Sequence, residues 1–221
     1  MKRPSTTRAE LRRQWDALAS ATGAGPRALV LTVCTGNICR SPPAEVLLRG
    51  SLPDLAVEVA SAGTHALVGH SMPEPAQQIG IRLGADAHDA AAHEGRLLTE
   101  SMLESADLVL AMSREHRARI LRALPAALRR TFTVREFARR ASQHPDAEIR
   151  AAAEAAGHEP RARIRAVAHL FSNSSGHSPD DPADDDVIDP YRQSTEVYEL
   201  SASQLQPALR TVEHVIRTTL R

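Results

Sequence analysis

Apolar residues along the chain form short continuous runs that alternate with segments of helical periodicity. The first run, residues 28–33 (ALVLTV), is rich in branched side chains and lacks polar alternation, which is typical of a strand buried on both faces of a parallel sheet. Similar runs predict further strands at residues 55–60, 108–112 and 131–134. The intervals between these four predicted strands are long enough to hold helices.

Helical patterns fill those intervals. One helix is expected directly after Pro42 and Pro43, because proline is tolerated in a first helical turn, and others are expected near residues 73–83, 99–104 and 114–123. Strands and helices that alternate at this spacing imply parallel pairing with right-handed crossovers. The predicted fold class is therefore α/β, a doubly wound four-stranded parallel sheet flanked by helices.

A helix is also predicted before the first strand. Residues 7–20 begin with Thr7 and Glu10 in capping-box spacing and carry an apolar stripe at helical spacing. We therefore expect an N-terminal helical extension, residues 1–27, followed by one catalytic domain, residues 28–221.

The composition of the chain changes after the fourth predicted strand. Residues 141–186 contain two predicted helices rich in alanine and arginine, at 146–156 and 161–171, and then a segment at 172–186 whose turn-forming composition predicts a mobile linker. A closing amphipathic helix is predicted at 197–217. The inserted helices carry enough apolar surface to pack weakly on the domain or to receive a partner, at Ile149, Ile164, Val167 and Leu170.

Composition and charge exclude several classes of protein. Hydrophobic residues make up 42% of the 221 positions, which is enough for a globular core, and the 27 basic and 27 acidic residues cancel, which argues against a nucleic-acid partner. No apolar run approaches the roughly 18 residues of a membrane span. The two cysteines, Cys34 and Cys39, are too close in sequence to staple distant parts of a secreted domain, so a cytoplasmic protein is expected.

The candidate chemistry lies in residues 34–41 (CTGNICRS), here called the Cys34 loop, between the first strand and a helix. Ligands of such sheets bind beyond the carboxyl ends of the strands, and a loop that enters a helix directs backbone N–H groups and the positive end of the helix dipole at an anion. Gly36 and Asn37 are residue types that accept left-handed backbone, and Arg40 offers a planar fork of donors. The same field stabilises the thiolate of Cys34, so a function outweighs the reading of Cys34 as a small buried hydrophobe. The anion contacts are predicted to come from Thr35, Gly36, Asn37, Ile38, Cys39 and Arg40.

Cys39 has two interpretations that the sequence leaves open. It either packs in the core or forms a redox clip with Cys34, since the curvature of the loop could bring the two sulfur atoms together.

The Cys34 loop and its flanks, VCTGNICRSP, resemble the signature of the low-molecular-weight protein tyrosine phosphatases of bacterial type. Four later segments resemble that family in order and spacing: residues 61–64 (SAGT), 93–99 (HEGRLLT), 106–116 (ADLVLAMSREH) and 189–191 (DPY). In other cysteine phosphatases the general acid precedes the nucleophile, so the late Asp-Pro-Tyr makes the resemblance specific.

The resemblance implies a role for each matching residue and implies no metal and no cofactor. Cys34 would attack phosphorus and carry a phosphocysteine, Arg40 would hold the phosphoryl oxygens, and Asp189 would protonate the leaving oxygen. Ser41 would hydrogen-bond the sulfur of Cys34. A supporting polar network would hold the loop in shape: Asn37, Ser61 and His93. Taken singly, His93 is more often a structural histidine, and an Asp-Pro pair is a common turn start.

The resemblance also suggests what the cleft accepts. Leu67 stands where many members of the family have an aromatic residue, and Tyr191 can stack on a phenyl ring. Members that act on phosphoarginine tend to have threonine where this chain has Ile38, so phosphotyrosine is favoured. The pattern is similar to a bacterial subgroup linked to tyrosine kinases of polysaccharide export, which makes a phosphotyrosine protein such as a bacterial tyrosine kinase the expected partner.

Two other functions remain open from the sequence. An arsenate reductase of the same fold would use the loop cysteine on arsenate, but thioredoxin-coupled versions need cysteines beyond the two present, and a version that uses a small thiol would not need Asp189. A non-catalytic phosphoprotein-binding module is expected to have lost Cys34, Arg40 or Asp189, and all three are present.

Overall fold

Four parallel strands form one sheet at the centre of the chain. The computed structural model describes residues 27–174, 179 and 181–221. The strand order is β2-β1-β3-β4, and every pair is parallel. The prediction of a four-stranded parallel sheet is therefore confirmed. The strands are β1 (Ala28–Cys34), β2 (Val57–Gly63), β3 (Leu108–Ala111) and β4 (Thr131–Thr133).

β1 lies between β2 and β3 and is buried along its whole length, as its continuous apolar run predicts. Its last residue, Cys34, pairs with Gly63 at the end of β2. β2 extends to Gly63, beyond the predicted 55–60, because the hydroxyl of the buried Ser61 finds hydrogen-bond partners inside the protein. The carboxyl ends of β1 and β2 thus meet at one edge of the sheet.

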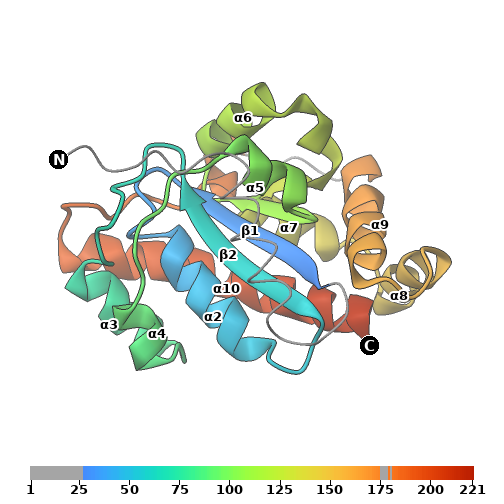
Figure 1. Cartoon of the computed structure of the whole chain (residues 1–221), viewed down its shortest axis with the longest axis horizontal. Helices are drawn as coiled ribbons and strands as arrows, with labels where there is room; N and C mark the ends of the chain where they lie inside the picture. The colour runs from blue at the N-terminus through green and yellow to red at the C-terminus, as the bar shows by residue number, and fades with distance from the viewer. Residues whose placement is uncertain (1–26, 175–178, 180) are drawn as a thin grey trace, which may run out of the picture.

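Helices cover both faces of the sheet (Figure 1). α5 and α6 pack on the face that carries Leu31 and Val109, whereas α2, α7, α8, α9 and α10 pack on the face that carries Val30 and Leu110. The helices are α2 (Ser41–Ser51), α3 (Glu74–Arg82), α4 (Ala87–Ala91), α5 (Glu100–Ser105), α6 (Arg114–Ala123), α7 (Val134–Ala141), α8 (Asp146–Ala155), α9 (Pro160–Asn173) and α10 (Thr195–Leu220), with 3-10 helices η1 (Pro125–Arg130) and η2 (Pro182–Asp185).

α7 is a helix that the sequence reading did not predict. It begins with a capping box, in which the hydroxyl of Thr133 accepts from the backbone N–H of Glu136 at 3.0 Å and the Glu136 carboxylate accepts from the backbone N–H of Thr133 at 3.3 Å. The Thr-x-x-Glu spacing was a readable signal for this helix. α7 contributes Phe137 to the main core.

The inserted helices α8 and α9 belong to the main core, so the expectation of weak packing is wrong. Ile149, Ile164, Val167 and Phe171 are all at most 3% exposed and lie in one cluster with residues of the sheet. The reason is the spacing of Ile164, Val167 and Phe171, which lie on one stripe of α9 that faces the core.

α9 also supplies the partners of a buried charge. The carboxylate of Asp107, just before β3, is fully buried and accepts from the Leu29 backbone N–H at 2.9 Å. Two guanidinium groups of α9 neutralise it, Arg161 at 3.0 Å and Arg165 at 2.6 Å. Removing α9 would take away both of these charge partners.

The segment predicted to be a mobile linker is tied to the domain where it is described. α9 continues through Asn173 into that segment. Close to its end, Asp185 pairs with Arg139 at 2.9 Å and Asp186 pairs with Arg114 at 3.1 Å. The sequence indicates that these acidic residues are solvated turn formers, but in the structure they form ion pairs with arginines of α7 and α6.

Two expectations extend beyond the described residues. The helix expected at residues 7–20 lies outside them, as do residues 175–178 and 180 of the predicted linker. No helix in the described part of the chain combines the length and the apolar character that a membrane span requires. The closing helix α10 is present and is longer than the predicted 197–217.

Candidate active site

The Cys34 loop connects the last residue of β1 to Ser41, the first residue of α2. Asn37 has a left-handed backbone (φ 56°), whereas Gly36 does not, although both were expected to adopt it. The turn at Asn37 directs its carbonyl at His93, which contacts it at 2.8 Å. One left-handed residue is thus enough to reverse the loop.

The sulfur of Cys34 accepts hydrogen bonds from two donors of its own loop. The Ser41 hydroxyl lies 3.0 Å from Sγ, and the backbone N–H of Asn37 lies 3.2 Å from it. The sulfur also lies near the N-terminus of α2, where the helix dipole favours negative charge. The two donors and the helix N-terminus thus direct positive partial charges at the sulfur of Cys34.

The guanidinium of Arg40 is buried and held from three sides. Its Nη1 donates to the Val187 carbonyl at 3.3 Å, and its Nη2 lies 3.4 Å from the Thr35 hydroxyl and 2.8 Å from the Asp189 carboxylate. The buried Nε has no hydrogen-bond partner among the described residues. A buried donor without an acceptor is costly, and an oxygen of an anion bound in the loop would satisfy it.

Asp189 reaches Arg40 because its segment is anchored to the end of β3. Residues 187–192 are here called the acid loop. The backbone N–H of Val187 donates to the Met112 carbonyl at 2.8 Å, directly after β3, and the Asp189 carboxylate accepts from the Tyr191 backbone N–H at 3.2 Å. The structure thus brings the three residues expected to do chemistry, Cys34, Arg40 and Asp189, to one cleft.

Asn37 is the centre of a buried polar network beneath the loop. The nitrogen of its side-chain amide donates to the hydroxyls of Ser41 at 3.0 Å and Ser61 at 2.7 Å, and the side-chain oxygen Oδ1 accepts from the Arg96 backbone N–H at 2.8 Å. Ser61 in turn donates to the carboxylate of Glu45 at 2.5 Å. The side chain of Asn37 has no unused donor here, so the network fixes the shape of the loop.

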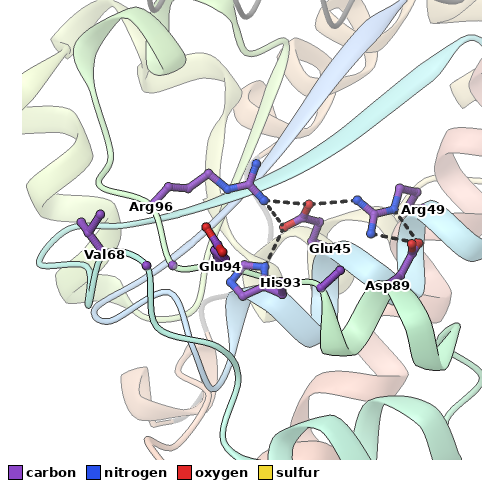
Figure 2. Close-up of a pocket in the computed structure, with 10 residues that line it drawn as sticks. Glu45, Arg49, Val68, Asp89, His93, Glu94 and Arg96 are labelled. Carbon is purple, nitrogen blue, oxygen red and sulfur yellow. Dashed lines mark hydrogen bonds and ion pairs between the residues drawn. The ribbon is translucent and has the colours of Figure 1, made fainter. Parts of the chain in front are cut away.

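Glu45 also belongs to this network, although it was not among the residues predicted from the sequence. Figure 2 shows Arg96 and Arg49 approaching its carboxylate from either side, at 3.2 Å and 3.1 Å, and Arg49 bridging on to Asp89 at 3.0 Å. Glu45 is 2% exposed, so this charge depends on its partners. The sequence predicts a solvent-exposed glutamate at this helical position. Its spacing of four residues from Arg49 was the only signal for an ion pair between the two side chains.

His93 supports the loop as an uncharged ring. Burial lowers its pKa below the usual range and outweighs the hydrogen bond to the Asn37 carbonyl and the charge of Glu45, which act in the opposite direction. Because the Asn37 carbonyl only accepts, Nε2 must carry the hydrogen and donate it. The Nδ1 atom lies 3.7 Å from the Glu45 carboxylate, beyond hydrogen-bond distance.

The walls of the cleft are mostly apolar. The cleft has a volume of about 230 Å³. Leu67 and Tyr191, the two expected wall residues, both line it, and the guanidinium of Arg192 lies 5.1 Å from the centre of the Tyr191 ring. Ile38 and Cys39 complete the apolar surface, and His65, which the sequence reading did not single out, lies at the rim.

Backbone hydrogen bonds hold the segment after β2 against the Cys34 loop. The N–H groups of Thr64, His65 and Leu67 donate to carbonyls of residues 34, 35 and 36 at 2.9, 2.9 and 3.0 Å. Gly63 allows this approach, because a Cβ atom there would lie 2.4 Å from the Thr35 carbonyl oxygen. The positions of His65 and Leu67 beside the nucleophile are therefore set by the backbone.

A larger cavity, of about 630 Å³, lies behind the loop and is bordered by the Glu45 network (Figure 2). None of its described lining residues is a cysteine, serine or threonine, and its arginines are already paired with Glu45 and Asp89. The smaller cleft holds Cys34 and the unpartnered donor of Arg40. We therefore identify the smaller cleft as the candidate active site.

One group of side chains among the described residues has the spacing of a metal site. Ligand atoms of Asp86, His88 and Asp89 lie within 4.8 Å of one another at the surface. Asp86 caps α4 and Asp89 pairs with Arg49, so both carboxylates have structural partners. The group does not line the cleft of Cys34.

Cys39 and Tyr198 form a buried pair beside the cleft. The sulfur and the phenol oxygen lie 3.7 Å apart. Burial raises the pKa of the Cys39 thiol to about 11 and also raises the pKa of Tyr198. Both cysteines are free, and Cys39 is a protonated thiol at neutral pH.

Comparison with known proteins identifies relatives over the part of the chain that contains the loop. The family model described as low molecular weight phosphotyrosine protein phosphatase matches residues 29–150, more than half of the chain. The low molecular weight protein-tyrosine-phosphatase Etp of Escherichia coli K12 is 43% identical over 103 residues, which are 47% of this chain and 66% of Etp. The match thus covers slightly less than two thirds of Etp.

Solved structures extend the similarity to most of the fold. YwlE arginine phosphatase from Geobacillus stearothermophilus matches with a TM-score of 0.59 and 27% identity, over 86% of this chain and 94% of that one. The tyrosine phosphatase Wzb from Escherichia coli K30, in complex with sulphate, matches with a TM-score of 0.57 and 26% identity, over 85% of this chain and 97% of Wzb.

Proposed function

Since the chain belongs to the low molecular weight phosphotyrosine protein phosphatase family, we propose that it hydrolyses phosphotyrosine in protein substrates through a phosphocysteine at Cys34. The observation that carries the proposal is the convergence of three groups in one cleft: a sulfur held by two donors, the buried Nε of Arg40 without a partner, and the carboxyl group of Asp189, which donates a proton in its acid form. A phosphate monoester needs a nucleophile, an oxyanion site and a proton donor, and these groups supply all three.

The reaction proceeds in two steps. The Cys34 thiolate attacks phosphorus while Asp189 gives its proton to the leaving phenolate oxygen, so that a phosphocysteine forms and tyrosine leaves. A water molecule then attacks the phosphocysteine, Asp189 takes the proton of that water, and the thiolate leaves with inorganic phosphate as product. Ser41 donates to the sulfur and stabilises it as it leaves. Arg40 and the loop N–H groups hold the three phosphoryl oxygens in both steps.

The cleft walls favour an aromatic leaving group. Ile38 and Leu67 offer no hydrogen bond, and Tyr191 can stack on a phenyl ring. A phosphoarginine substrate would place a polar guanidinium between the same apolar surfaces, where Asp189 is the one carboxylate of the described lining that could accept from it. Some relatives are arginine phosphatases, so the discrimination must be measured.

The test is turnover of phosphotyrosine, phosphoserine and phosphoarginine peptides by the purified protein, with arsenate reduction measured alongside. Only phosphotyrosine should be hydrolysed rapidly. Cys34→Ser should abolish this turnover, because a serine hydroxyl is not ionised at neutral pH. Ile38→Thr should shift the ratio of rates toward phosphoarginine. Faster reduction of arsenate than hydrolysis of phosphotyrosine would overturn the proposal.

The proposed partner is a cytoplasmic bacterial tyrosine kinase that carries phosphotyrosine. The free, buried cysteines support a reducing compartment. An autophosphorylated kinase domain, incubated with the protein and followed by the loss of phosphotyrosine signal, tests this assignment. A rate on the kinase no higher than the rate on a short phosphotyrosine peptide would argue against a dedicated partner.

A further inference from the structure

His116 bridges the first turn of α6 and the Cys34 loop. It is 4% exposed, and both of its ring nitrogens have partners. Nδ1 lies 2.7 Å from the hydroxyl of Ser113, the N-cap residue of α6, and Nε2 lies 2.8 Å from the hydroxyl of Thr35. The Ser113 oxygen also accepts from the His116 backbone N–H at 3.3 Å. The plane of the ring is therefore fixed from the side of the helix.

Thr35 connects this ring to the oxyanion site. Its hydroxyl oxygen lies 3.4 Å from Nη2 of Arg40, and Thr35 follows the nucleophile directly in sequence. A hydroxyl has one hydrogen and two lone pairs. When Nε2 of His116 engages the Thr35 hydroxyl on one side, it fixes the direction of the lone pair that is left to accept from Arg40. Without that partner the Thr35 hydroxyl could rotate away from Arg40.

The ring acts as a neutral group. Burial lowers the pKa of His116 to about 4, and the Arg40 guanidinium acts in the same direction. The other charged groups that influence the ring are Glu115 and Asp189, which oppose this shift, and Arg119, which supports it. A neutral imidazole has one donor and one acceptor nitrogen, and hydroxyls, which match either, are its two partners.

We propose that His116 is a positioning residue for the oxyanion site. Through the Thr35 hydroxyl it holds the guanidinium of Arg40 in the orientation that leaves Nε free for an oxygen of the phosphoryl group. The proposal rests on the proposed function, because it assigns Arg40 to phosphoryl binding. A residue that only packs α6 against the loop would have no influence on the orientation of Arg40, which distinguishes the two roles.

Two near-matched variants test the proposal. Gln in place of His116 places an amide near the position of Nε2 and keeps a partner for Thr35, whereas Asn places its amide near Nδ1 and reaches only Ser113. We expect His116→Asn to weaken competitive inhibition by inorganic phosphate about tenfold, which is the scale of a buried hydroxyl that loses its partner. His116→Gln should stay within about threefold of the unmodified protein.

A double-mutant cycle with Thr35→Val shows whether the effect passes through Thr35. If it does, Thr35→Val alone weakens phosphate binding, and adding His116→Asn causes no further loss. Additive losses would overturn the proposal, and so would unchanged phosphate binding in His116→Asn with only a lower melting temperature. Ser113→Ala is a second variant in case His116→Asn does not fold, since it frees the ring without changing it. Unchanged phosphate binding there would also overturn the proposal.

The experiment separates this proposal from the proposed function. An unmodified protein that binds no phosphate and hydrolyses no aryl phosphate overturns both. If the unmodified protein binds phosphate and hydrolyses aryl phosphates, and His116→Asn binds phosphate equally well, only the role of His116 is overturned.

Discussion

The ion pair between Arg40 and Asp189 predicts that replacing Asp189 has two effects of opposite sign. In the structure the Asp189 carboxylate lies 2.8 Å from Nη2 of Arg40, the guanidinium that we assign to the phosphoryl oxygens. A phosphate that enters the cleft must compete with this carboxylate. Asp189→Ala therefore removes a proton donor and, at the same time, removes a competitor for the oxyanion site.

The two effects differ widely in size. The Asp189 side chain is 49% exposed, so solvent screens the pair and its contribution is at most about 1 kcal/mol, which corresponds to an affinity for phosphate up to about fivefold higher in the variant. Loss of the general acid should slow hydrolysis of phosphotyrosine by about 10² to 10⁴-fold. An activated phenolate departs without a proton, so dinitrophenyl phosphate should be affected far less.

The assay compares steady-state hydrolysis of a phosphotyrosine peptide and of dinitrophenyl phosphate, together with inhibition by inorganic phosphate. Asp189→Asn is the matched control, because it removes the charge but keeps the shape of the side chain. Both variants should bind phosphate at least as tightly as the unmodified protein. An equal loss of rate for the two leaving groups would refute the role of Asp189 as the acid, and weaker phosphate binding would refute the competition.

The remaining predictions concern oxidation, acid and the inserted helices. Mild peroxide should convert Cys34 to a sulfenic acid, which condenses with the Cys39 thiol to give a disulfide and water. The Cys39→Ser variant should therefore recover less activity on reduction than the unmodified protein. The absence of a Cys34–Cys39 linkage in mass spectra of the oxidised unmodified protein would contradict this prediction. Because burial lowers the pKa of His116 from 6.5 to about 4, the unfolded chain binds a proton that the folded chain does not, so up to about 3 kcal/mol of stability is lost between those pH values. His116→Gln should reduce this loss in urea titrations at pH 7 and pH 4.5, and equal losses in both proteins would contradict it. Phe171→Ala should cost about 3 to 5 kcal/mol of unfolding free energy, whereas the exposed His169→Ala should cost little; similar values for both would mean that α9 packs loosely.

The sheet and the Cys34 loop could be predicted because their signals are local. A continuous apolar run marks β1, and a strand followed by a polar loop and a proline-containing helix start places Cys34 at an anion-binding position. The end of β2 was harder, because Ser61 and Gly63 look unlike strand residues. Their polarity and size are explained by Asn37 and by the close approach of the Thr35 carbonyl, which are contacts across the fold.

The partners of buried charges could not be predicted in the same way. Glu45 and Asp107 are both buried, and in sequence each looks like an ordinary acidic residue, Glu45 within a helix and Asp107 just before a strand. Glu45 is compensated by Arg96, and Asp107 by Arg161 and Arg165. These arginines belong to distant segments, and in a chain so rich in arginine no local pattern selects the right ones.

The arrangement of the sheet explains how the acid loop tolerates a long insertion before it. Cys34 ends β1, and β3 lies beside β1, so any segment that hydrogen-bonds to the residue after β3 comes close to the nucleophile. Val187 does this through Met112, and its own carbonyl accepts from Arg40. The chain between β4 and Val187 needs only to return to this point, and α8 and α9 do so while they fill the core on one face of the sheet. The position of Asp189 therefore depends on the backbone contact at Met112, and we expect the insertion to affect Asp189 chiefly through the stability of the core that supports that contact.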